Sequence, residues 1–144
     1  LKEKILWLEF CTDTSDWTRL ADKYRVREFV MQRGMGDMLV KLYGKWTIPD
    51  EIDYSLLPEK FVLKCNHDSG SCHIVDKTIG FDKTAIHADL NRRIKKKFGA
   101  DNGEMHYTRI EPCIIAEEYL EGLAEVLYDY NVFCFHGNQY IFHE

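Results

Sequence analysis

The amino-acid sequence predicts an α+β fold, in which helices come first and strands mixed with one further helix follow. Residues 17–33 and 83–98 repeat apolar side chains at helical spacing, and residues 60–66 alternate apolar and polar side chains. Short polar connections separate the later apolar runs, which is typical of hairpins. We therefore expect a mixed or antiparallel sheet with packed helices rather than an all-parallel sheet.

The first third of the chain is predicted to be mainly helical. Residues 1–10 form a short apolar helix, and a single amphipathic helix follows over residues 17–33. Gly34 is expected to end this second helix, because glycine readily adopts the left-handed conformation found at helix ends. A short strand over residues 39–43 and a loop over residues 44–59 come next.

The clearest predicted strand covers residues 60–66. Phe61, Leu63 and Cys65 point to one side, because successive side chains alternate in a strand. Val62, Lys64 and Asn66 point to the other side. A polar loop over residues 66–71 then turns the chain back through residues 72–75, so we expect a hairpin.

The second half of the chain alternates helix and strand. Asp82 is a good N-cap for a helix over residues 83–98, whose buried stripe repeats every fourth residue. An apolar strand over residues 113–117 follows a loop. Two apolar runs near the C-terminus, within residues 132–142, predict a second hairpin.

Composition narrows the classes of protein. The chain has 144 residues, and its 19 basic and 24 acidic residues give a net charge of −5. A non-specific nucleic-acid binder is normally basic, so no nucleic-acid partner is expected. No apolar run reaches the roughly 20 residues of a transmembrane helix, so no transmembrane segment is expected. The five cysteines are an odd set without a C-x-x-C pair, which favours reduced thiols and a cytoplasmic protein.

A phosphate-binding site is one interpretation of Lys64 and the loop that follows it. A strand lysine beside the small residues Ser69, Gly70 and Ser71 can bring a cation and backbone N–H groups to one phosphate. The alternative is an exposed lysine on an edge strand before a tight turn. Neither the P-loop motif nor the dinucleotide-binding glycine motif occurs in the sequence.

A structural zinc site is an alternative for the same segment. Cys65, His67, Cys72 and His73 are four potential zinc ligands within nine residues. Their spacing fits no usual zinc finger, and adjacent residues of a strand point apart.

Two charged segments also allow more than one interpretation. Glu117 and Glu118 at the end of an apolar strand are an acid–base pair, a solvated strand end, or a hinge whose backbone binds a ligand. The basic run over residues 92–97 is expected to be a solvated helix face, because cations are favoured near a helix C-terminus.

Four segments, in order along the chain, together resemble the TupA-like ATP-grasp family. They are DKYRVREFV at 22–30, LPEKFVLKCNHDSG at 57–70, PCIIAEEYL at 112–120 and DYNVFCFHG at 129–137. The resemblance covers about residues 18–142, and the segment up to Gly70 is the most specific. Members of this family are linked to cell-surface polysaccharide biosynthesis, and some are labelled glycosyltransferases.

The resemblance implies an ATP site between two α+β subdomains. Lys23 would reach the phosphates, and Lys64 would lie between adenine and the α-phosphate. The loop would form a flexible cover over the other phosphates, and a hinge at 117–120 would bind the adenine edge through its backbone. Glu121 or Glu125 would hold the ribose hydroxyls. The implied nucleotide-binding residues are Lys23, Lys64, Asn66, His67, Ser69, Gly70, Ser71, Glu117, Glu118, Tyr119, Leu120 and Glu121.

The implied chemistry is ATP-dependent ligation of a carboxylate to an amine through an acyl phosphate. The donor, the acceptor and the oligomeric state are left open. Two lysines suit this chemistry, because charge moves onto phosphoryl oxygens and must be neutralised.

The chain departs from the family pattern at three places. Asn131 stands where the family has a lysine, and Cys72 stands near the usual position of a second loop glycine. Mg²⁺ is expected for the family, but its acidic and asparagine ligands would follow Glu144, so no metal ligand is assigned. The first residue is not methionine. We therefore expect a fragment, in which the fold is incomplete at its C-terminus.

This expectation divides the chain into three parts. They are a helical lead-in at 1–16, a first ATP-grasp subdomain at 17–112, and the hinge with the start of a second subdomain at 113–144. Two alternatives to a ligase remain open, namely a degenerate nucleotide-binding module without catalysis and a small zinc-stabilised interaction domain.

Overall fold

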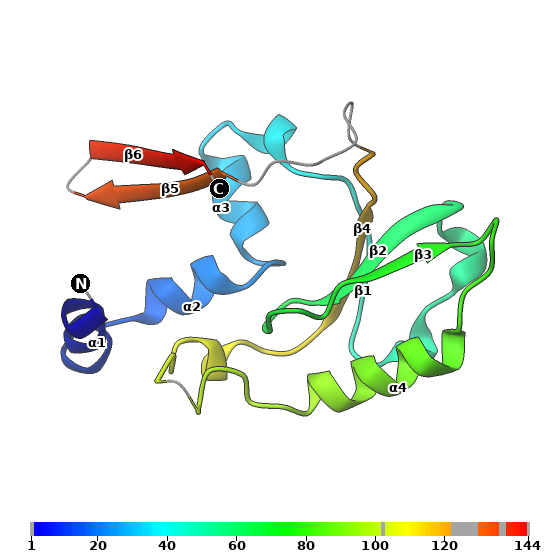
Figure 1. The fold of residues 1–144 in the computed structure, drawn as a ribbon, viewed down its shortest axis with the longest axis horizontal. Helices are drawn as coiled ribbons and strands as arrows, with labels where there is room; N and C mark the ends of the chain where they lie inside the picture. Colours follow the sequence, from blue (N-terminus) through cyan, green and yellow to red (C-terminus); the bar gives the residue numbers. More distant parts are fainter. Residues whose placement is uncertain (1, 102, 122–129, 136–137, 144) are drawn as a thin grey trace.

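The computed structural model describes residues 2–101, 103–121, 130–135 and 138–143. These residues form an α+β structure (Figure 1). Its helices are α1 (Lys2–Cys11), α2 (Ser15–Ala21), α3 (Val26–Gln32) and α4 (Lys83–Ile94). Its strands are β1 (Leu42–Trp46), β2 (Lys60–Cys65), β3 (His73–Asp76), β4 (Ile114–Glu118), β5 (Tyr130–Phe135) and β6 (Asn138–His143). The α+β class predicted from the sequence is confirmed.

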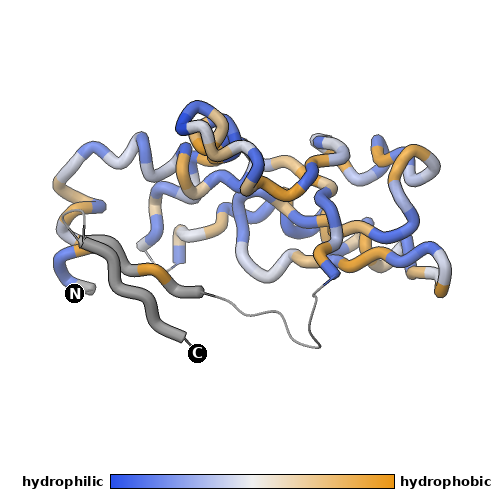
Figure 2. Tube along the Cα trace, turned by 90° about the horizontal axis from the view of Figure 1, so that it is seen from above, coloured by the Kyte–Doolittle hydropathy of each residue, from blue (hydrophilic) through white to orange (hydrophobic). Residues whose placement is uncertain are grey.

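Four strands form the central sheet, in the order β1-β4-β2-β3. Each neighbouring pair is antiparallel, which confirms the expected strand arrangement. β2 and β4 are the two inner strands, and residues 114–116 of β4 are completely buried. Hydrophobic and hydrophilic segments alternate along the chain trace (Figure 2).

The core lies between the sheet and α4. Phe61, Leu63 and Cys65 of β2 are completely buried and form one cluster with Ile86 and Leu90 of α4. The alternate residues of β2 are only partly buried. The predicted strand and the apolar stripe on the helix are both confirmed. The apolar side chains of the strand and those of the helix stripe pack against each other.

The single helix predicted over residues 17–33 is wrong, because the chain forms α2 and α3 with a break between them. Asp22 causes the break. Its buried Oδ1 accepts hydrogen bonds from the backbone N–H groups of Tyr24 at 2.8 Å and Arg25 at 3.2 Å. A short acidic side chain that binds the following backbone favours a new helix start over a continuous helix.

Two other boundaries differ from the prediction. β1 begins at Leu42 rather than residue 39, because pairing with β4 sets its extent, from Leu42 opposite Glu117 to Trp46 opposite Ile114. α4 begins after Asp82, whose side chain accepts the Ala85 N–H at 2.9 Å as predicted. It ends at residue 94 rather than 98, so the lysines at 95–97 lie beyond the helix.

The predicted C-terminal hairpin is confirmed by β5 and β6, which pair antiparallel from Tyr130 opposite His143 to Phe135 opposite Asn138. The polar stretch that precedes this hairpin in the sequence lies outside the described residues. Among the helices of the described residues, none is long and apolar enough to span a membrane.

Candidate functional site

A cavity of about 450 Å³ lies on the face of the sheet that points away from α4. Its lining residues come from β2, β3, the end of β4 and the segments next to β1 and β4. They are Val40, Val62, Lys64, Cys72, Ile74, Glu117, Glu118, Tyr119 and Leu120. Val62 and Lys64 belong to the alternate set of β2, so the strand period places them opposite the buried core residues.

The cavity combines apolar walls with a few charged groups. Val62 and Ile74 are directly paired across β2 and β3, and Val40 adds a third aliphatic side chain. Lys64 and Glu117 supply charge beside them. A concave site with apolar walls and few polar groups is typical of small-molecule binding.

Glu117 is the centre of a buried ion cluster at this cavity. Only 7% of its side chain is exposed, and Oε1 lies 3.2 Å from Nη1 of Arg27 on α3. Its other oxygen, Oε2, contacts Nζ of Lys64. Arg27 also donates to the carbonyl oxygen of Val40, so it connects α3 to the cavity wall. A buried carboxylate requires such partners, because removing one leaves an uncompensated charge.

Lys23 brings a second cation to the same end of β2. Its backbone N–H donates to the carbonyl oxygen of Asn66 at 3.1 Å, and its Nζ donates to the carbonyl oxygen of Asp68. Burial lowers the pKa of the Lys23 ammonium; the carboxylate of Asp68 opposes this shift and the positive charge of Lys64 adds to it. Two ammonium groups that repel each other favour an anion between or beside them.

The loop over residues 66–71 is anchored through its buried side chains. The Asn66 side-chain amide donates to Asp22 Oδ1 at 2.9 Å and to the Glu111 carbonyl oxygen at 3.0 Å, and its Oδ1 accepts the Cys113 N–H at 2.7 Å. Ser71 accepts the Cys65 N–H at 2.9 Å. Ser69 and Gly70, by contrast, are exposed at the loop tip, and Gly70 has a φ of 80°.

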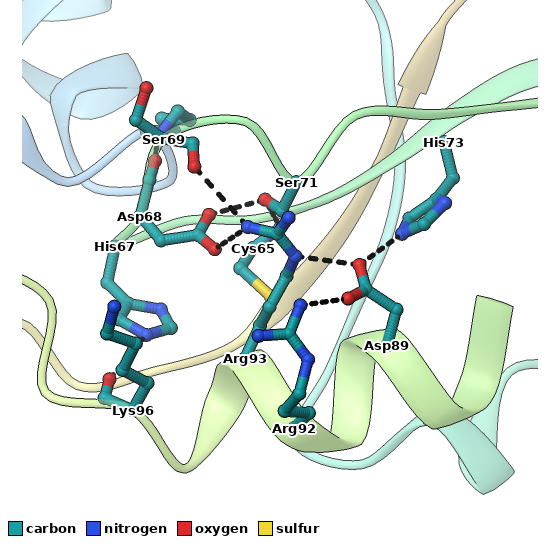
Figure 3. A network of polar contacts seen from close by, with 11 residues as sticks. Cys65, His67, Asp68, Ser69, Ser71, His73, Asp89, Arg92, Arg93 and Lys96 are labelled. Carbon is teal, nitrogen blue, oxygen red and sulfur yellow. Dashed lines mark hydrogen bonds and ion pairs between the residues drawn. The ribbon is translucent and has the colours of Figure 1, made fainter. Parts of the chain in front are cut away.

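A polar network joins this loop to α4 (Figure 3). Asp68 accepts from Ser71 and lies 2.9 Å from Nη1 of Arg93, whose Nε lies 2.7 Å from Asp89. His73 Nε2 also lies 2.9 Å from Asp89. Arg93, expected to belong to a solvated basic run, is therefore half-buried and structural. Its signal in the sequence is the Asp89 carboxylate four residues earlier on the helix.

Asp89 remains ionised well into the acidic range. Burial opposes its ionisation, but hydrogen bonds from Arg92, Arg93 and His73 outweigh this and hold the pKa of the carboxyl at about 2. The two carboxylates of the network, Asp68 and Asp89, each lie next to Arg93.

The possible zinc ligands are not gathered into a metal site. His73 is bound to Asp89, and His67 Nε2 faces the Lys96 carbonyl oxygen at 3.2 Å. Cys65 is buried in the core, which raises the pKa of its thiol to about 12, and Cys72 is exposed at the cavity. Within the described residues, no group of three or more His, Cys, Asp or Glu side chains could hold a metal ion. The geometry gives no support to the zinc-stabilised alternative.

The structure gathers part of the predicted ATP site into one cavity. The residues it brings together there are Lys64, Glu117, Glu118, Tyr119 and Leu120, with Lys23 beside them. Asn66, His67 and Ser71 instead turn their side chains to internal partners. Glu121 is exposed and lies 3.2 Å from Lys60 Nζ. The alternative ribose partner Glu125 lies outside the described residues, as does the side chain of Asn131.

Four residues of this region were not predicted. They are Arg27, Val40, Val62 and Ile74. The alternation of β2 carried a signal for Val62, since it shares a face with Lys64. Nothing local in the sequence indicates that Arg27 reaches Glu117, ninety positions away.

Comparison with known proteins gives one match. The family model described as TupA-like ATPgrasp matches residues 3–144. No curated protein and no solved structure matches the chain.

Proposed function

Because the chain belongs to the TupA-like ATP-grasp family, we propose that the cavity opposite α4 binds ATP. ATP-grasp membership implies ATP binding in general, and the cavity adds a place for it. The observation that carries the proposal is the meeting of Lys64 and residues 117–120 in one apolar-walled cavity, with Lys23 at the same end.

The apolar side chains suit the adenine ring. Val62 and Ile74 are a cross-strand pair, and Val40 and Leu120 complete the aliphatic lining. β4 ends at Glu118, so the backbone groups of Tyr119 and Leu120 follow the end of the ladder and suit hydrogen bonding to the adenine edge. This is the hinge role that the family resemblance implies for the segment.

The two lysines suit the phosphates. Lys64 lies on the cavity wall, and its ammonium contacts Glu117. A triphosphate would offer stronger negative charge than this one shared carboxylate, so we propose that Lys64 turns toward the α-phosphate while Arg27 keeps Glu117 neutralised. Lys23, held at the carbonyl of Asp68, would contact the outer phosphates.

The activity we propose is ATP-dependent joining of a carboxylate to an amine in cell-surface polysaccharide biosynthesis. Lys23 and Lys64 would neutralise the charge that develops on phosphoryl oxygens. The family also implies Mg²⁺, which would stabilise the same charge. The described residues offer no acidic group of three or more that fits Mg²⁺, so no step is assigned to a metal. A cytoplasmic location belongs to this proposal.

Calorimetric titration with a non-hydrolysable ATP analogue tests the proposal. We expect saturable binding to the wild-type chain, and about tenfold weaker binding to Lys64→Ala because a charge-assisted phosphate contact is lost. Lys83→Ala is the matched control. Lys83 is exposed on α4, so this substitution removes the same charge from the other side of the sheet. Thermal unfolding of each variant establishes that it is folded.

Three outcomes separate the hypotheses. No binding to the folded wild-type chain, or equal binding to both variants, would overturn the proposed site. Binding with ATP turnover in the presence of carboxylate and amine substrates supports the ligase. Binding without turnover over a broad set of such substrates favours the degenerate module.

A further inference from the structure

A second, smaller cavity lies at the C-terminal end of α4, on the helix-covered side of the sheet. Its volume is about 190 Å³, which is far more than the roughly 10–15 Å³ that a cavity needs to hold one water molecule. The lining residues come from the loop after β2, the end of α4 and the segment before β4. They are His67, Ile94, Lys95, Lys96, Lys97, Tyr107, Thr108, Ile110 and Pro112.

His67 is the unusual member of this lining. Only 1% of the residue is exposed, yet its ring atom Nδ1 is buried without a hydrogen-bond partner in the described part of the chain. Buried polar atoms nearly always have a partner, so an unpaired one requires an explanation, and a water molecule or an ion bound beside it is one. The other ring nitrogen, Nε2, is satisfied by the carbonyl oxygen of Lys96 at 3.2 Å.

The contact of Nε2 determines whether Nδ1 of His67 accepts or donates a hydrogen bond. A carbonyl oxygen only accepts, so Nε2 carries a hydrogen atom. In the neutral ring Nδ1 is then an acceptor, and in the charged ring it is a second donor. The partner of Nδ1 is therefore either a donor such as a hydroxyl group, or an anion.

The surrounding charges favour an anion. Lys95, Lys96 and Lys97 line the cavity, and no acidic side chain is among its lining residues. Asp68, next to His67 in the chain, is already bound to Arg93 and Ser71 on the network side. The carbonyl groups at the end of α4 oppose an anion, but the three lysines bring positive charge to the same cavity.

The opposite wall adds neutral groups. Burial, followed by the negative charge of Glu104, raises the pKa of Tyr107, so its phenol is protonated and can donate. Thr108 donates its hydroxyl to the Met105 carbonyl oxygen at 2.7 Å. The negative charge of Glu104 acts on Tyr107, but Glu104 is not among the lining residues.

We propose that the cavity beside His67 binds a small oxyanion of the phosphate type, with Nδ1 of His67 as its buried donor. This site is separate from the proposed ATP cavity. His67 follows the buried set of β2, whereas Lys64 belongs to the alternate set, so the two cavities lie on opposite sides of the same loop. The ligand is either free phosphate or a phosphate group on a larger molecule.

Nuclear magnetic resonance of the imidazole rings tests the proposal on the whole chain. We expect inorganic phosphate to shift the His67 resonances saturably, toward the values of a doubly protonated ring. His67→Gln serves to assign the signal, and the wild-type titration is decisive even if that variant folds poorly. No saturable shift at His67, at any phosphate concentration that leaves the protein folded, would overturn the proposal.

Charge variants test which side chains hold the phosphate. Lys95→Ala with Lys97→Ala should weaken phosphate binding about fivefold or more, whereas Lys83→Ala and Lys64→Ala should leave it unchanged. Equal loss in Lys64→Ala would place the phosphate in the other cavity and overturn the proposal.

A phosphate monoester such as glycerol phosphate separates the two sources. Competition between it and inorganic phosphate for the same His67 shift supports a site that also accepts a phosphate group on a larger molecule. A shift with free phosphate alone supports the proposal with free phosphate as the ligand. Failure of this titration would leave ATP binding in the first cavity unaffected, so the two proposals fail separately.

Discussion

The two faces of strand β2 differ in what their side chains contact. Phe61, Leu63 and Cys65 are completely buried against the α4 side, whereas Val62 and Lys64 line the larger cavity. The period of two in a strand produces this separation within six residues. Substitutions on the first face should therefore change the free energy of unfolding, and substitutions on the second should mainly change ligand binding.

The largest expected effect comes from the buried face. Leu63→Ala should lower the free energy of unfolding by about 2–5 kcal/mol, because it leaves a cavity in the core. Val62→Ala removes two methyl groups from the half-buried face and should cost about 1 kcal/mol or less. Urea denaturation followed by circular dichroism measures both. Equal losses would show that the two faces do not divide as described.

A second variant breaks the network that joins the loop to α4. Arg93→Met should lower the free energy of unfolding by about 2–3 kcal/mol, because the buried carboxylate of Asp68 loses its ionic partner. Arg92→Met is the matched control. Its side chain is 64% exposed, so its ion pair with Asp89 should contribute about 0.5 kcal/mol. Should both variants lose the same stability, the network would be a surface feature without an anchoring role.

The pH dependence of stability tests the same network through Asp89. The pKa of the Asp89 carboxyl is about 2, which is below the ordinary pKa of an aspartate. Ionised Asp89 therefore stabilises the folded state at every pH above that ordinary pKa. This contribution is lost as pH falls toward 2, and it is on the order of 1–2 kcal/mol. Unfolding of the wild type and Asp89→Asn between about pH 2 and pH 6 measures it. A difference that stays constant with pH would contradict the assignment.

Three elements of the fold could be predicted from short sequence patterns alone. β2, the start of α4 at Asp82 and the C-terminal hairpin follow from alternation, capping and turn residues. The break between α2 and α3 was missed, because the apolar period continues across Asp22. The Asp22 side chain accepts from the backbone that follows it, and its further contact with Asn66, 44 positions away, has no local signal in the sequence.

The candidate site shows the same limit. The family segments contain Lys64 and residues 117–120, and the structure brings them together in one cavity. The buried anchoring of the loop was missed, because it depends on Arg93 and Cys113 from distant segments. The unpaired Nδ1 of His67 has no signal in the sequence at all, since it depends on which side of the loop the ring occupies.

The smallest expected effect tests the exposed end of the cavity face. Glu121 has a side chain that is 74% exposed and pairs with Lys60, so Glu121→Gln should change the free energy of unfolding by about 0.5 kcal/mol or less. If Glu121 holds the ribose hydroxyls, as the family resemblance implies, the variant should bind a non-hydrolysable ATP analogue roughly fivefold more weakly. A 2′,3′-dideoxy form of the analogue lacks those hydroxyls and should bind both proteins equally. The same fivefold loss with the dideoxy analogue would exclude the ribose contact, and no loss with either would move the prediction to Glu125.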